Sequence, residues 1–119
     1  MRAFLSDVCL RPSCYNCMFK GLNRQSDITL ADFWGIQNIL PEMDDDKGTS
    51  LVFVNSRADR ELFYDIKDGM SYQETDINEA VKYNPLAVKS AVPNNSRDNF
   101  FRDLKCMPFD TLVKRYCSD

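Results

Sequence analysis

The chain has 119 residues, of which 44% are hydrophobic and 28% are charged, as expected for one ordinary globular domain spanning residues 1–119. Its 15 basic and 18 acidic residues give a net charge of −3, which argues against binding to nucleic acid or anionic membranes, because both depend on neutralising phosphates. No apolar run approaches the roughly 18 residues of a membrane span, and no signal-peptide core is present, so we expect a cytoplasmic protein.

The first half of the chain reads as two short strands between helical turns. Apolar residues on one side of 1–8 predict the end of a helix, and a loop follows over 14–24. Alternation and β-forming residues over 27–34 predict a strand. A short helical turn over 36–40 then leads to a second, buried strand over 51–55.

The second half is mainly helical. An apolar face predicts a helix over 57–68, and a further strand is expected over 70–74. Shorter helices follow over 77–83, 97–106 and 109–117.

This order of elements predicts an α/β or α+β fold. We expect a small sheet of about three strands, flanked by short helices and followed by a C-terminal helical segment. The helix between the strands at 51–55 and 70–74 favours a parallel crossover, although the antiparallel arrangement stays open.

The five cysteines indicate metal binding or free thiols rather than a disulfide framework. Their number is odd and no secretion signal accompanies them. The chain has no histidine, which excludes Ser-His-Asp and Cys-His catalysis as well as His-ligated zinc. Proton or electron transfer therefore needs other residues or a cofactor.

Cys14 and Cys17 form a C-x-x-C motif, whose spacing lets two thiolates turn toward one metal, in zinc sites as in iron–sulfur sites. Cys9 extends it to C-x4-C-x2-C, the spacing of plant-type 2Fe–2S ferredoxins. A second C-x-x-C, as in a zinc ribbon, does not exist. Either Cys106 folds back as a fourth ligand or the other ligands lie elsewhere, and the alternative is that all five cysteines, Cys117 included, are reduced structural thiols.

The sequence around this motif resembles the C-terminal domain of the coenzyme F420 hydrogenase/dehydrogenase β-subunit family, in its bacterial iron–sulfur flavoprotein branch. Residues 11–20 and 26–35 carry the most specific part of the likeness. It continues, more faintly toward the end, over residues 40–51, 55–56, 84–85 and 97–104. The resemblance therefore extends over essentially the whole chain, and it implies a piece of a longer protein.

The resemblance implies a 4Fe–4S cluster and FAD, with electrons passing to or from a ferredoxin-type domain or subunit. Cys14 and Cys17 match the cluster ligands of the family, and the remaining ligands come from a central domain. Cys9 stands where many relatives have another residue. Given this resemblance, Arg24 together with Asp27 or Asp32 is a candidate to line the junction between cluster and flavin, and Gly35 permits a close backbone approach to either group. The alternative is that Asp27 is a strand-entry carboxylate and Asp32 belongs to the turn at the strand end.

Two functions follow as hypotheses. In the first, the chain is part of an iron–sulfur flavoprotein oxidoreductase and is inactive without the other domains. In the second, it is a non-catalytic scaffold or interaction domain whose C-x-x-C binds zinc or stays empty. Iron with sulfide in protein purified without oxygen supports the first, and zinc or no metal supports the second.

Overall fold

A computed structural model describes residues 1–117 as two compact units of mixed helix and sheet. One unit combines the two ends of the chain, Met1–Met18 and Ser90–Asp119, and the other is the central stretch Phe19–Lys89. The prediction of a chain that mixes helices with a small sheet is confirmed, and the expectation of one domain stays a prediction.

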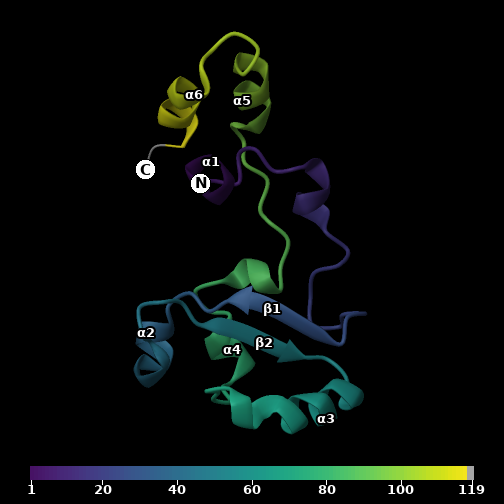
Figure 1. Ribbon diagram of the computed structural model, residues 1–119. Coiled ribbons are helices and arrows are strands. Elements are labelled where there is room, and N and C mark those ends of the chain that lie inside the picture. The colour runs from purple at the N-terminus through teal and green to yellow at the C-terminus, as the bar shows by residue number, and fades with distance from the viewer. Residues whose placement is uncertain (118–119) are drawn as a thin grey trace. The chain divides into compact units, whose positions relative to one another are not determined.

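The central unit is built on a two-stranded antiparallel sheet (Figure 1). Strand β1 (Ile28–Asp32) pairs with β2 (Ser50–Val54) along its full length, so that Ile28 lies opposite Val54 and Asp32 opposite Ser50. Because side chains alternate between the faces of a sheet, one face turns inward. The apolar cluster that fills this unit consists of the buried residues Phe33, Ile36, Leu51 and Ala80.

The expected third strand over 70–74 is wrong. Among the described residues the sheet contains β1 and β2 alone, and 70–74 forms neither helix nor strand. Met70 is extended, with φ −131° and ψ 150°, but the Tyr72 ring packs edge-on against Phe63, with 5.3 Å between ring centroids. The local β preference of this segment fits the extended backbone at Met70. The segment packs a side chain onto helix α3 and forms no hydrogen-bonded pairing with a strand. Because 70–74 is not a strand, it forms neither a parallel nor an antiparallel pair with the strand predicted over 51–55.

Two helices of the central unit begin at side-chain caps. Helix α3 (Arg57–Ile66) starts at Ser56, whose Oγ accepts a hydrogen bond from the Asp59 amide at 3.2 Å. Helix α4 (Ile77–Ala80) starts at Asp76, which accepts from two amides, and it is shorter than the predicted 77–83. The other short elements are α2 (Ile36–Ile39) and the 3₁₀ turns η2 (Pro41–Met43), η3 (Lys67–Gly69) and η4 (Pro85–Ala87).

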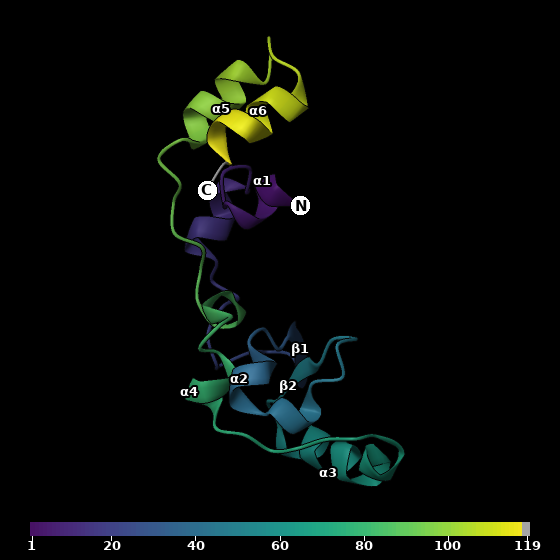
Figure 2. The ribbon, with the colours of Figure 1, turned by 90° about the vertical axis from the view of Figure 1, so that its left-hand side faces the viewer.

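The unit formed by the chain ends is helical. Helices α5 (Arg97–Asp103) and α6 (Phe109–Tyr116) lie side by side in Figure 1 and Figure 2. Helix α1 (Arg2–Leu5) also contacts α6, and the 3₁₀ turn η1 (Pro12–Asn16) follows it in the chain. The apolar core of the unit consists of the buried residues Ala3, Val8, Phe100, Leu112 and Cys117.

Asp103 joins α5 to α6 through a small polar network. Its Oδ2 accepts a hydrogen bond from the Tyr116 hydroxyl at 2.6 Å, and its Oδ1 accepts from Arg102 Nε at 3.2 Å. Arg115 of α6 adds an ion pair at 3.4 Å. The Tyr116 hydrogen bond, assisted by Arg102 and Arg115 and opposed by burial, lowers the pKa of Asp103.

We expect Tyr116→Phe to destabilise the chain in a pH-dependent way. Because the folded-state pKa of Asp103 lies below its unfolded value, its carboxylate contributes stability above about pH 4, and this is lost as pH falls through the lowered pKa. The substitution removes the main cause of the lowering. Denaturant titrations should therefore show a lower free energy of unfolding for Tyr116→Phe near pH 7, and this difference from the unsubstituted chain should narrow toward about pH 3. An equal difference at both pH values would contradict this assignment.

Candidate functional site

The C-x-x-C motif lies on the 3₁₀ turn η1 and at the position just after it. Pro12 opens this turn, and the Cys14 amide donates to the Arg11 carbonyl at 2.9 Å. Cys17 directly follows the last residue of the turn. A 3₁₀ helix has three residues per turn, so the spacing of Cys14 and Cys17 corresponds to one turn, with Cys17 as the extended residue that follows η1. Both side chains are half-buried free thiols, so they can act together as metal ligands.

A later segment of the same unit holds this turn in place. The Cys17 amide donates to Ser90 Oγ at 2.9 Å, and the Ala91 amide donates to the Cys14 carbonyl at 3.2 Å. From the turn, the Tyr15 hydroxyl donates to the carbonyl of Asp7, which lies before the turn in the chain, at 2.5 Å. Nothing in the sequence pointed to Ser90 or Ala91, because neither belongs to a motif.

Cys9 has a different environment. It packs against the apolar core of its unit, the cluster that includes Val8 and Cys117. Among residues 1–117, no group of three or more Cys, Asp or Glu side chains is arranged to hold a metal ion. The structure therefore does not bring Cys9 together with Cys14 and Cys17.

Arg24 and Asp27 belong to the central unit. Arg24 uses its guanidinium within that unit, since Nε donates to the Gly21 carbonyl at 3.0 Å and a terminal nitrogen donates to the Ala87 carbonyl. Asp27 is exposed, and its backbone carbonyl accepts from the Asn55 amide at 2.7 Å, next to the end of the β ladder. Arg24 thus connects its own loop to the turn η4, and the Asp27 backbone adds a hydrogen bond beside the sheet.

Gly35 also lies in the central unit, at the start of α2. Its φ of +76° is in the left-handed region that favours glycine. A Cβ at this position would lie 2.2 Å from Cδ2 of the Tyr83 ring. The group that closely approaches Gly35 in the structure is therefore Tyr83, and an approach of this glycine to a flavin or cluster stays a prediction.

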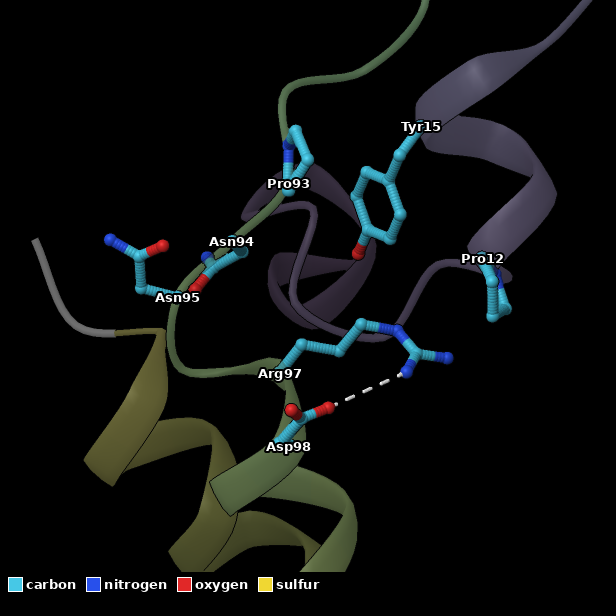
Figure 3. A pocket seen from close by; sticks show the side chains of 7 residues that line it. All are labelled: Pro12, Tyr15, Pro93, Asn94, Asn95, Arg97 and Asp98. Atoms are coloured by element: carbon cyan, nitrogen blue, oxygen red, sulfur yellow. Dashed lines mark ion pairs between the residues drawn. The ribbon is translucent and has the colours of Figure 1, made fainter.

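An open concavity lies on the described surface of each unit. In the terminal unit a pocket of about 340 Å³ lies beside η1, lined among others by Tyr15, Asn94 and Arg97 (Figure 3). Arg97 also faces Asp98 there, with 3.9 Å between nitrogen and oxygen. In the central unit a groove of about 1060 Å³ runs along β2 and α3. None of Arg24, Asp27 and Gly35 lines either concavity.

The donors present fit part of an iron–sulfur site and no more. A 4Fe–4S cluster takes four thiolates, and the turn offers the pair Cys14 and Cys17. The described residues do not converge on a third ligand, so a complete cluster does not fit within them. For a flavin, none of the candidates Arg24, Asp27 and Gly35 lines either of the two concavities described above.

These features define a mixed helix-and-sheet protein with paired thiols on a short turn. The family model for the C terminus of the coenzyme F420 hydrogenase/dehydrogenase beta subunit matches residues 3–80, which is more than half of the chain. The chain therefore belongs to this family. The match includes the C-x-x-C but not 97–104, where the likeness stays a prediction. Searches of curated proteins and of solved structures found no match.

The helices of the described part are all too short or too polar to cross a bilayer.

Proposed function

We propose that this chain is part of an iron–sulfur flavoprotein oxidoreductase, in which Cys14 and Cys17 are two ligands of a 4Fe–4S cluster. The observation that carries the proposal is the pair of free thiols, one on the 3₁₀ turn η1 and one directly after it, inside the stretch that matches the family. Such a cluster would relay single electrons to or from a flavin, and its iron and the flavin supply the redox chemistry.

The ligands that this chain does not provide indicate which partners it needs. Since a cluster needs more thiolates than the turn offers, the others come from another part of the β subunit or from a companion chain. We propose that FAD is bound there as well, and that a ferredoxin-type domain or subunit exchanges electrons with the cluster. The packing of Cys9 in the apolar core favours a structural thiol at that position.

A second candidate is a non-catalytic interaction domain. The observation that favours it is the absence of three converging ligands among residues 1–117. In this case the C-x-x-C would bind zinc together with ligands from a partner, or stay empty.

Iron analysis separates the two candidates. The protein, purified without oxygen with its companion subunits, should contain iron and sulfide, and Cys14→Ser or Cys17→Ser should remove one cluster, about four iron atoms. Cys106→Ser is the matched control, because Cys106 is an exposed thiol of the same unit, and it should leave iron unchanged. Unchanged iron in the Cys14 and Cys17 variants, or zinc in place of iron, would contradict the proposed function.

A further inference from the structure

Ser90 makes an unusual pair of contacts with Cys17. Its Oγ accepts a hydrogen bond from the Cys17 amide at 2.9 Å and lies 3.4 Å from the Cys17 carbonyl, to which it donates. A hydroxyl can do both at once, because it carries one donor and two acceptor positions. One side chain, 73 positions further along the chain, therefore satisfies both backbone groups of a cysteine.

The residue after Ser90 holds the other cysteine. The Ala91 amide donates to the Cys14 carbonyl at 3.2 Å, and Ala91 itself is buried. Two consecutive residues thus fix the backbones of Cys14 and Cys17. We call this pair, Ser90 and Ala91, the cysteine clamp.

The same segment is tied to the chain before the turn at two more points. Asn94 Nδ2 donates to the Ser6 carbonyl at 2.8 Å, and Arg97 Nε donates to the Leu10 carbonyl at 2.9 Å. The Arg97 guanidinium also lies 4.6 Å from the centre of the Phe101 ring, which anchors it on α5. The clamp is therefore fixed to the helical core and is not a loose loop contact.

A clamp of this kind matters because a 3₁₀ turn is weak by itself. Such turns have poor hydrogen-bond geometry and rarely persist beyond a few residues. Cys17 stands just outside η1 with an extended backbone, φ −77° and ψ 112°, so the turn's own hydrogen bonds do not fix it. The direction of its thiol is then set by whatever holds its backbone, which is Ser90.

We infer that Ser90 is a positioning residue for the thiol pair, holding Cys17 so that its sulfur and that of Cys14 face one metal atom. The inference rests on the proposed function of this pair. Ser90 lies outside residues 3–80, so the part of the chain beyond the family match contributes to the site. Residues that orient metal ligands without touching the metal typically change affinity by about 10- to 100-fold when they are removed.

Phenylarsine oxide tests this inference in the full 119-residue chain without any iron. The reagent forms two As–S bonds with a pair of thiols that face one atom and releases water. Cys14→Ser and Cys17→Ser should each abolish the adduct, as read by intact mass. Ser90→Ala should weaken the binding by about 10-fold, measured in competition with a small dithiol, whereas Ser90→Thr, which keeps the hydroxyl, should restore it.

Two further variants separate positioning from folding. Ser13→Ala removes an exposed hydroxyl beside Cys14 and should bind the arsenical like the unsubstituted chain. Valine has the shape of threonine but no hydroxyl. If Ser90→Val and Ser90→Thr melt at the same temperature, a difference in their arsenical affinity reports the hydrogen bonds of the hydroxyl alone.

The outcomes are distinct from those of the iron analysis. Equal arsenical affinity for Ser90→Ala, Ser90→Val and the unsubstituted chain would overturn the inference and leave the proposed function intact. Arsenical affinity that Cys14→Ser leaves unchanged would also overturn it, because the sulfurs of Cys14 and Cys17 would then not bind one arsenic atom together. An iron content that Cys14→Ser leaves unchanged would instead contradict the proposed function, whatever the arsenical affinities are.

Discussion

Phe100→Ala should destabilise the chain by about 3–5 kcal/mol. Phe100 is 1% exposed, and its ring packs edge-on against Phe101, Phe109 and Tyr116, with centroid distances of 5.6, 6.4 and 6.0 Å. Removing the ring leaves a cavity between α5 and α6 that these neighbours fill only in part. Since small domains are stable by only about 5–15 kcal/mol, this loss removes a large share of the free energy of unfolding.

The matched control for this change is Phe109→Ala. It removes the same side chain from the same aromatic group, but Phe109 is 58% exposed, so we expect a loss below about 1 kcal/mol. Denaturant titration followed by circular dichroism measures both variants. Similar losses for the two would show that the interior between α5 and α6 is not packed as described.

The two strands and the longer helices were predictable from the sequence, because their signals are local. Alternation over 27–34 and the apolar run over 51–55 gave β1 and β2 within a few residues. Ser56 and Asp76 start their helices with side-chain hydrogen bonds to nearby amides, which a sequence pattern already contains. The third strand was not predictable in this way, since a strand also needs a partner, and 70–74 has none.

The candidate site likewise has a part that local sequence signals predict and a part that depends on long-range contacts. The C-x-x-C was identified by its spacing alone, because two cysteines three positions apart can direct both thiols toward one metal. The clamp at Ser90 was not, since its contact with Cys17 spans 73 positions and depends on how the chain folds back. Cys9 shows the converse case, in which a regular spacing suggests a ligand while the half-buried side chain packs against the apolar core of the terminal unit.

The position of Gly35 leads to the second large effect, for Gly35→Ala. A Cβ there would lie 2.2 and 2.3 Å from two atoms of the Tyr83 ring and 2.9 Å from the Tyr83 Cβ, all closer than atoms can approach. The φ of +76° adds about 1–2 kcal/mol for a residue with a side chain. Together with about 1–3 kcal/mol for forced packing, we expect a loss of about 2–5 kcal/mol, measured by denaturant titration.

Two variants resolve this loss into its causes. Gly48→Ala introduces the same methyl group at a φ of +98° with no atom within 4 Å, so it should show only the backbone part of the cost. Tyr83→Ala in the Gly35→Ala chain removes the two closest atoms and should recover stability beyond the sum of the single changes. If Gly35 is instead kept free for a flavin or cluster, as the sequence suggested, Tyr83→Ala would bring no recovery, and Gly35→Ala would cost no more than Gly48→Ala. The size of the coupling between positions 35 and 83 therefore decides whether this glycine serves the fold or a bound group.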